Sequence, residues 1–383
     1  MPTKSSVPSK KKVFRPAPFQ SAKSAASIAA KSKAAKSSRK PAAPFKSKTG
    51  KSSGRPVAGG KPAQPGKAPA KQPPKTPQQS GATTYTLVVE PDQGLTAIYN
   101  LIASAKESID MTMYELTDAT VINALIKAQA AGIQVRVILD QNDEKTANTP
   151  AYNELAAGKV AVHWANPKYA VTHQKTITVD QTTSAIMTLN LTPNAYATTR
   201  DFAVITNDAG DVAAIETTFN ADFKNAAITP PTGDNLVWSP TNSSSALLAL
   251  INGATASLLI SQEEFSDTQI ASALESASKR GVAVTLVQEN QENKYNPVLT
   301  PLKQAGAKIA VYTSTDAKAY YIHAKSVLAD YKTPQAKLFL GSENFSTNSL
   351  SKNRELGLIF SDAACMTGVY NALTADFKNG TLF

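Results

Sequence analysis

With 383 residues, the chain has room for more than one domain, and its 40 Lys and Arg against 29 Asp and Glu give a formal net charge of +11. The single cysteine excludes an internal disulfide. No apolar run has the length of a signal peptide or of a membrane span. These features predict a protein that is cytoplasmic or held peripherally on an anionic surface.

Residues 1–82 carry all of the excess positive charge. They contain 19 of the Lys and Arg, no Asp or Glu, and only three aromatic residues. Such a segment buries too little apolar surface to fold, so we predict a disordered basic tail rich in Lys, Ala, Ser and Pro. A mobile polycation binds polyanions without sequence preference, so nucleic acid and anionic lipid are both candidate partners. A solubilising or spacing tail is the alternative. The remaining residues hold 21 basic and 29 acidic side chains and are therefore acidic.

Beyond the tail, strand patterns alternate with helix patterns. In the first half, strands are predicted at 84–89, 108–114, 134–139, 160–164, 185–189 and 202–206, and helices at 94–107, 119–131 and 211–223. Gly132 directly follows the second of these helices and is a C-cap signal.

The same order of elements then repeats. Strands are predicted at 236–239, 256–261, 282–288, 309–312, 337–341 and 355–360, and helices at 244–254, 268–279 and the C-terminus. Gly132 and Gly281 are 149 residues apart, and the phrase Ala-Asp-Phe-Lys-Asn occurs at 221–225 and again at 375–379. Recurring landmarks at a near-constant offset indicate an internal duplication. We therefore predict an α/β protein with repeats at 83–232 and 233–383, joined through the turn-rich segment 229–234.

Each half contains one His-x-Lys-x-x-x-x-Asp pattern, formed by His173, Lys175 and Asp180 and by His323, Lys325 and Asp330. The β-branched residues between 172 and 180 predict a strand, in which a histidine and the lysine two positions later share a face. The aspartate has the opposite parity, so we expect it to hold a neighbouring loop or helix end. The third histidine, His163, is interpreted as a packed strand residue.

The doubled pattern resembles the signature of the phospholipase D superfamily, in which His-x-Lys-x4-Asp is followed by Gly-Ser-x-Asn. The second half has Gly341-Ser342-Glu343-Asn344 in full, whereas the first half has Met187-Thr188-Leu189-Asn190 and keeps only the asparagine. The resemblance covers residues 83–383. It implies two α/β sandwich halves packed about a pseudo-twofold axis, with both His-Lys segments at one shared active site. The predicted protein is thus a monomer whose site is formed like that of a dimer.

The resemblance also implies a two-step cleavage of a phosphodiester. A neutral imidazole attacks phosphorus to form a phosphohistidine, and a second, protonated imidazole donates to the leaving alkoxide and then activates water or an alcohol. The family assigns the attack to His173 and the acid–base role to His323. Lys175 and Lys325 would neutralise the non-bridging oxygens as charge develops.

Other side chains are assigned supporting roles. Asp201 lies 28 residues after His173, Glu355 lies 32 residues after His323, and the resemblance implies that these carboxylates orient the imidazoles. No Cys/His cluster has zinc spacing and no acidic cation loop is present, which predicts a reaction without metal or cofactor. Neutral donors to the phosphate are predicted at Asn190, Asn344 and Ser342.

Three functions fit this pattern. The first is hydrolysis of phospholipid head groups, with transfer to alcohols, at a membrane surface. The second is a metal-independent nuclease on the same fold, which the acidic body disfavours and the basic tail favours. The third is a non-catalytic polyanion-binding protein, which the two intact His-Lys pairs disfavour. No long apolar loop for bilayer insertion is evident, yet the breadth of the family favours the lipid substrate.

Overall fold

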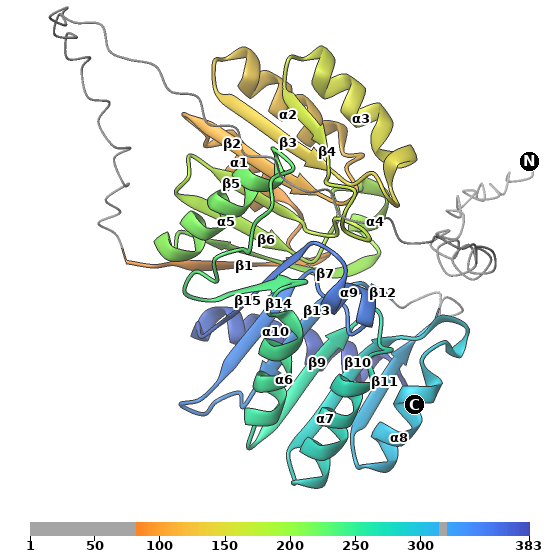
Figure 1. Cartoon of the computed structure of the whole chain (residues 1–383). Helices are drawn as coiled ribbons and strands as arrows, with labels where there is room; N and C mark the ends of the chain where they lie inside the picture. The colour runs from red at the N-terminus through yellow and green to blue at the C-terminus, as the bar shows by residue number, and fades with distance from the viewer. Residues whose placement is uncertain (1–81, 314–319) are drawn as a thin grey trace, which may run out of the picture. The chain divides into compact units, whose positions relative to one another are not determined.

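The structure is a computed structural model that describes residues 82–313 and 320–383 (Figure 1). The predicted disordered tail therefore lies outside the described residues, apart from Ala82. Among the helices that the structure describes, none combines the length and the apolar character needed to cross a bilayer.

The first half builds one mixed sheet with its helices. Its strands are β1 (Tyr85–Glu90), β2 (Ser108–Met113), β3 (Gln134–Leu139), β4 (Ala161–Trp164), β5 (Thr176–Val179), β6 (Thr183–Met187) and β7 (Thr199–Thr206). Its helices are α1 (Thr96–Ala103), α2 (Ala119–Ala130), α3 (Lys145–Ala157), α4 (Pro193–Tyr196) and α5 (Ala209–Asp222).

The second half repeats this series. Its strands are β8 (Leu236–Ser239), β9 (Ser257–Gln262), β10 (Ala283–Glu289), β11 (Lys308–Tyr312), β12 (Tyr321–Ile322), β13 (Lys325–Ala329), β14 (Lys337–Gly341), β15 (Glu355–Phe360) and β16 (Thr381–Leu382). Its helices are α6 (Ser243–Gly253), α7 (Thr268–Lys279), the 3-10 turn η1 (Gln291–Asn293), α8 (Asn296–Gln304), α9 (Thr347–Ser351) and α10 (Ala363–Asn379).

The order of strands in the two sheets confirms the predicted duplication. The first sheet runs β1-β7-β6-β5-β2-β3-β4, and the second runs β8-β15-β14-β13-β9-β10-β11 with β16 added at its edge. Each strand of the first half thus has a counterpart at the same place in the second, and β12 and β16 are additional. In both sheets the three strands that follow helical crossovers are parallel, and the remaining strands join antiparallel.

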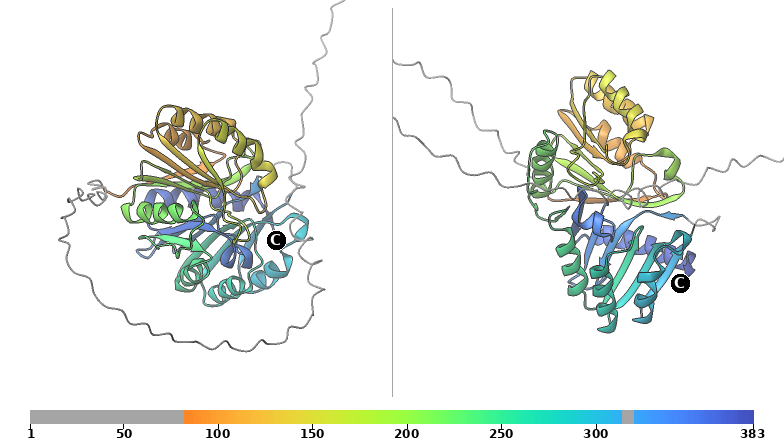
Figure 2. Two further views of the ribbon diagram at one scale, coloured as in Figure 1. Left: turned by 45° about the horizontal axis from the view of Figure 1, so that its top comes forward. Right: turned by 45° about the vertical axis from the view of Figure 1, so that its right-hand side comes forward.

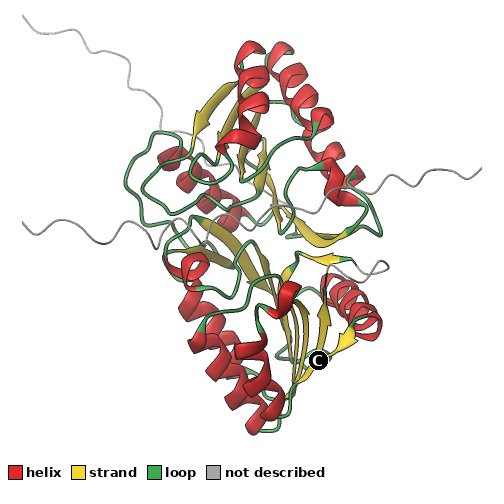
Figure 3. Ribbon diagram, turned by 90° about the vertical axis from the view of Figure 1, so that its right-hand side faces the viewer, coloured by secondary structure: helices red, strands yellow, loops and turns green. Residues whose placement is uncertain are grey.

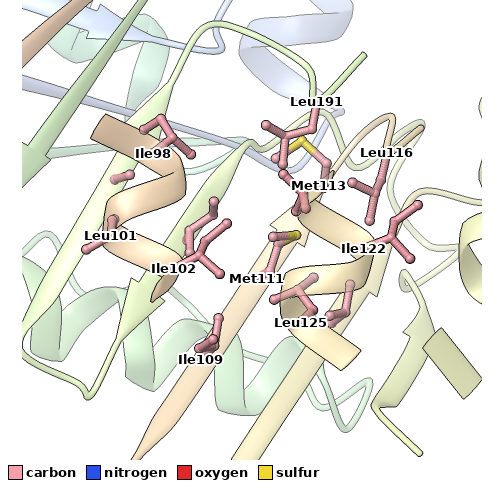
Figure 4. Packing of buried hydrophobic residues seen from close by; sticks show 14 of the residues in the cluster. Ile98, Leu101, Ile102, Ile109, Met111, Met113, Leu116, Ile122, Leu125 and Leu191 are labelled. Atoms are coloured by element: carbon pink, nitrogen blue, oxygen red, sulfur yellow. The ribbon is translucent and has the colours of Figure 1, made fainter. Parts of the chain in front are cut away.

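The core has three main parts, which lie on the faces of the two sheets. Figures 2 and 3 show the helices that cover these faces. Helices α1, α2 and α3 cover one face of the first sheet, where Ile98 and Leu101 of α1 pack with Met111 of β2 (Figure 4). Helices α6, α7 and α8 cover one face of the second sheet in the same way. The third part joins residues of both sheets with α5 and α10, and includes Phe202 and Leu356. Burial of each such side chain contributes about 1.5–3 kcal/mol.

The termini of α2 and α7 show why the repeats fold alike. Asp118 and Asp267 are the N-caps, and each side chain accepts hydrogen bonds from two backbone N–H groups of the first turn. Beyond the C-termini, Gly132 and Gly281 both have a φ of +92°, which a glycine adopts without steric cost. The predicted C-cap at Gly132 is thus confirmed.

Four helices were not predicted: the short α4 and α9, and the longer α3 and α8, each of which contains a proline in its interior. Pro150 lies inside α3 and Pro301 lies inside α8. A proline in the helix interior removes a backbone hydrogen bond, so the sequence favours a loop there. The buried residues Leu155 and Leu299, which pack into the cores, show that tertiary packing overrides this local preference.

The two halves meet where β6 of the first sheet contacts β14 and β15 of the second. The short strand β12 of the second half pairs in parallel with β7 of the first half. Thr172 of the first half forms an isolated bridge with Arg354 of the second. The two contacts are counterparts of each other, because each joins a His-Lys segment to a strand of the opposite repeat. This reciprocity is the pseudo-twofold relation that the resemblance implies.

Candidate active site

Each catalytic histidine that the sequence predicts lies on a segment held by the opposite half. The backbone N–H groups of His173 and Gln174 both donate to the carbonyl of Arg354, at 2.9 and 3.1 Å. Those of His323 and Ala324 donate to the carbonyl of Arg200, at 3.2 and 2.9 Å. Both segments are therefore fixed at the interface between the repeats.

This pairing corrects the predicted strand over residues 172–180. Strand β5 covers only Thr176–Val179, and His173 and Lys175 precede it. The backbone leaves the first sheet there because its N–H groups pair with Arg354. The two side chains nevertheless contact one ring, that of Tyr114. The imidazole centroid and the Lys175 Nζ atom each lie 4.7 Å from its centroid.

A carboxylate fixes the residue that precedes each histidine. Asp140 follows β3 and accepts the backbone N–H of Thr172 at 2.7 Å. Glu289 ends β10 and accepts the N–H of Ile322 at 3.0 Å. Both acids are nearly fully buried. Neither acid was predicted from the sequence, although their spacing of 149 residues matches the offset of the other landmarks.

The two orienting carboxylates are exchanged between the halves. His173 Nδ1 lies 2.8 Å from Glu355 Oε2, and His323 Nδ1 lies 2.8 Å from Asp201 Oδ1. In the sequence, each carboxylate follows the histidine of its own half. The order of the residues therefore gives no sign of this exchange. Because a carboxylate accepts, each Nδ1 carries the proton and each Nε2 is left for chemistry.

The carboxylates are themselves held in place. Thr188 donates its hydroxyl to Asp201 Oδ1 at 2.5 Å, and Asn353 donates to Glu355 Oε1 at 2.9 Å. Burial would raise the pKa of Glu355, but His173 lowers it below its usual range. Glu355 is therefore an anion that can stabilise charge on His173 during the reaction.

Both lysines are buried at the site. Lys175 Nζ donates to the carbonyl of His173 at 2.7 Å, and Lys325 Nζ forms an ion pair with Glu263 at 2.7 Å. Burial and the positive charge of Lys325 lower the pKa of Lys175 to about 7. The pKa of His173 is also lowered, by burial and then by Lys175, although Glu355 opposes the shift. A neutral imidazole suits a nucleophile.

The three predicted phosphate donors differ in their surroundings. Asn190 is half-buried, and its side-chain oxygen has no hydrogen-bond partner within 82–313 and 320–383. Asn344 accepts from the Glu264 backbone N–H at 3.0 Å and donates to Glu263 Oε2 at 3.3 Å. Ser342 is fully buried, and its hydroxyl bonds the backbone of Leu356. Ser342 thus joins β14 to β15, and its role as a phosphate donor stays a prediction.

Thr188 explains how the first half manages without Gly-Ser. It stands where the second half has Ser342, and it bonds the backbone N–H of Phe202 at 2.8 Å as Ser342 bonds that of Leu356. Both repeats therefore have a hydroxyl that bonds the backbone of the next strand, while only the second repeat has the glycine. Glycine is needed at 341 because an added Cβ would lie 2.4 Å from the Gly357 Cα atom.

The motif aspartates lie at the other end of their strands. Asp180 accepts the backbone N–H groups of Lys106, Glu107 and Ser108 at 2.7–3.0 Å, in the loop between α1 and β2. Asp330 does the same for residues 255–257, between α6 and β9. Burial would raise the pKa of each carboxyl, but the backbone donors lower it. These contacts are of the loop-holding kind that the strand parity suggests.

A pair of crossed ion pairs connects the repeats beside the site. Arg200 binds Asp376 with two bonds of 2.7 and 3.0 Å. Arg354 binds Asp222 with two contacts of 2.9 and 3.1 Å. Each arginine directly precedes an orienting carboxylate, and each aspartate belongs to the repeated phrase Ala-Asp-Phe-Lys-Asn. That phrase was the available signal, but its partners could not be read from the sequence.

The site is not symmetric at the ends of β2 and β9. Tyr114 follows β2 and places its ring against His173 and Lys175. The counterpart, 149 residues later, is Glu263, whose carboxylate lies against Lys325 and 3.6 Å from His323 Nε2. Neither residue was predicted to belong to the site. In the described residues, no group of three or more His, Cys, Asp or Glu side chains is arranged to hold a metal ion.

The lowered pKa values predict how any phosphodiester cleavage at this site would depend on pH. Lys175 acts as a cation, so kcat/KM should fall as pH rises through its pKa of about 7. His173 must be neutral, and its lowered pKa places the acidic limb below the ordinary histidine value. Measuring kcat/KM from acid to alkaline pH tests this in the wild type and in Lys175→Arg. Arginine keeps its charge throughout, so the alkaline limb should move upward. An unmoved limb would assign it to another group.

Comparison with known proteins agrees with this geometry. The model of the cardiolipin synthase, PLD-like domain family matches residues 98–223 and 247–379, once in each repeat. A phospholipase D from Rickettsia conorii is 33% identical over 111 residues, which are 29% of this chain and 54% of that protein. One from Rickettsia bellii is 29% identical over 132 residues, 34% and 65% of the respective chains. The matched segments thus span about half to two thirds of these relatives.

Solved structures share the fold. Polyphosphate kinase from Porphyromonas gingivalis has a TM-score of 0.62 at 15% identity and covers 77% of this chain and 47% of its own. Phosphatidylserine synthase from Haemophilus influenzae has a TM-score of 0.61 at 12% identity and covers 78% and 87%. At these identities the likeness concerns the fold alone. The family match in both repeats, more than half of the sequence, shows that the chain belongs to the phospholipase D superfamily.

Proposed function

We propose that the protein is a phosphodiesterase of the phospholipase D type that hydrolyses phospholipid head groups through a covalent phosphohistidine. The observation that carries the proposal is the exchange of carboxylates, which binds Nδ1 of His173 and of His323 and leaves Nε2 of each ring for chemistry. Two imidazoles in this state, with the buried ammonium group of Lys175, match the needs of a double displacement at phosphorus.

In the first step, His173 Nε2 attacks phosphorus and the bond to the leaving oxygen breaks. His323 gives its Nε2 proton to that oxygen, so the alcohol leaves neutral. In the second step, His323 takes a proton from water, and the resulting hydroxide attacks the phosphohistidine and restores His173. An alcohol in place of water would yield a transferred phosphatidyl group.

Lys175 and Glu355 support the charges of this sequence. Glu355 faces the Nδ1 proton of His173 and stabilises the cation that forms when Nε2 bonds to phosphorus. Lys175 is the buried ammonium group closest in sequence to the nucleophile, and it would balance the non-bridging oxygens. Asn190, whose amide oxygen has no partner among the described residues, could turn either end of its amide toward the phosphate.

The phospholipid substrate rests on the relatives. The two Rickettsia proteins are named phospholipase D, and the matching family model carries the name of a lipid-forming enzyme. The basic tail, with 19 Lys and Arg in residues 1–82, would hold the enzyme near anionic lipid. Both observations bear on the choice of substrate, and the proposed cleavage chemistry does not depend on them.

The test compares two substrates under one condition. The full chain is incubated in chelator with phosphatidylcholine vesicles, with and without ethanol, and separately with plasmid DNA. We expect release of choline, formation of phosphatidylethanol when ethanol is present, and no nicking of the plasmid. DNA nicking without choline release would identify a nuclease instead. Binding to the plasmid with neither reaction would identify a non-catalytic polyanion-binding protein.

A further inference from the structure

Three groups that should bind a phosphate converge on one carboxylate of the protein itself. Glu263 Oε2 lies 2.7 Å from Lys325 Nζ, 3.3 Å from Asn344 Nδ2 and 3.6 Å from His323 Nε2. Its other oxygen accepts the hydroxyl of Tyr321 at 2.8 Å. The carboxylate is thus held from both sides and occupies the anion-binding donors of the second half.

Among the described residues, the first half has no such internal anion. The counterpart of Glu263 is Tyr114, which donates its hydroxyl to Asp143 at 2.8 Å. Lys175 contacts the Tyr114 ring and a backbone carbonyl, and within 82–313 and 320–383 it forms no salt bridge with a carboxylate. The shared site therefore carries one more negative charge than it would if the second half also had a tyrosine in place of Glu263.

The carboxylate of Glu263 is ionised. Burial would raise its pKa, but Lys325 and His323 lower it well below the usual range. Protonation near neutral pH therefore cannot remove the charge. Lys325 is fully buried against it, so this lysine cannot serve as an uncompensated cation for a ligand.

We propose that Glu263 sets the charge selectivity of the site, so that it accepts a phosphate group with one negative charge and rejects a group with two. A phosphodiester carries one charge, which Lys175 can balance. A phosphomonoester is mainly a dianion at neutral pH, and its second charge would face Glu263. Repulsion between two like charges that lie close together in a partly desolvated site weakens binding strongly. The inference deepens the proposed function, on which its biological meaning rests.

The charge is removed in Glu263→Gln, which keeps the size of the side chain. Binding of methyl phosphate at pH 7 is followed by calorimetry or ³¹P NMR. We expect the variant to bind methyl phosphate at least about tenfold more tightly than the wild type, because the opposing charge is gone. The matched control is Glu264→Gln, which removes the same charge one residue later, from a side chain that pairs with exposed Lys294. It should change phosphate affinity by less than about twofold. Equal effects of both variants would overturn the proposal.

A second measurement uses the wild type and does not depend on how the variant folds. Methyl phosphate and dimethyl phosphate differ by one charge at neutral pH and present the same kind of group to the site. We expect the wild-type protein to bind dimethyl phosphate more tightly, and Glu263→Gln to reverse that order. Tighter binding of methyl phosphate by the wild type would refute the role of Glu263.

These binding results separate the two proposals. Tighter phosphate binding by Glu263→Gln in a protein that cleaves no diester would uphold the selectivity and reject the proposed function. If the protein cleaves phosphatidylcholine but Glu263→Gln leaves its phosphate affinity unchanged, the function is upheld and the selectivity is rejected.

Discussion

Replacing His173 with alanine is expected to lower turnover of bis(p-nitrophenyl) phosphate by about 10³-fold or more, because the nucleophile of the first step is lost. The measurement is steady-state release of p-nitrophenol in chelator. The control is His163→Ala, which removes the third histidine. His163 stacks on Phe223 and bonds its carbonyl, and it takes no part in the site. Full turnover by His173→Ala would show that the proposed site is wrong.

Replacing His323 tests which imidazole attacks. A p-nitrophenolate leaves without a proton, so His323→Ala should still form the phosphohistidine on this substrate. It should then stall, because no base activates water, and release about one equivalent of p-nitrophenol per site in a burst. His173→Ala should show no burst. The opposite pattern would exchange the roles of the two histidines.

Breaking one crossed ion pair is expected to cost the most stability. Arg354 is almost fully buried, binds Asp222 with two contacts and lies over the rings of Tyr169 and Trp238. Arg354→Ala leaves Asp222 without its partner, and we expect a loss of about 3–5 kcal/mol in the free energy of unfolding. The measurement is denaturant unfolding, with comparison of midpoints at unchanged slope.

A double-mutant cycle separates the ion pair from lost packing. Asp222→Ala alone should also destabilise the protein, because it leaves a buried guanidinium unpaired. The double variant should lose less than the sum of the two single losses, since no lone charge remains. The matched control is Arg280→Ala, at an exposed arginine that only donates to the carbonyl of Asn252. Additive losses in the cycle would contradict a coupled pair.

Much of the fold could be predicted because its signals are local. Period, caps and the 149-residue offset between Gly132 and Gly281 located the strands, helices and repeats. The helices with Pro150 and Pro301 were missed because packing, a long-range effect, outweighs the local cost of proline. The His-Lys strand was extended too far for the same reason, since its start pairs with Arg354 of the other repeat.

The sequence predicts which residue types form the candidate site, but not which of their side chains contact each other. His173, Lys175, His323 and Lys325 lie where a doubled motif places them, at the interface of the repeats. A motif says nothing about partners from the other half, so the exchange of Asp201 and Glu355 was not foreseen. Glu263 was missed because an acidic residue after a strand has no distinctive pattern. Only its contacts with Lys325 and His323 show that it belongs to the site.

The difference between Tyr114 and Glu263 has an evolutionary consequence. In an assembly of two identical subunits, any substitution beside one histidine appears beside the other as well. Fusion of the two copies in one gene removes that constraint, and the two copies can diverge. A phenol ring can then lie beside His173, the proposed nucleophile, while an acid lies beside His323, the proposed acid and base. Linkage in a single polypeptide thus permits specialisation that self-association forbids.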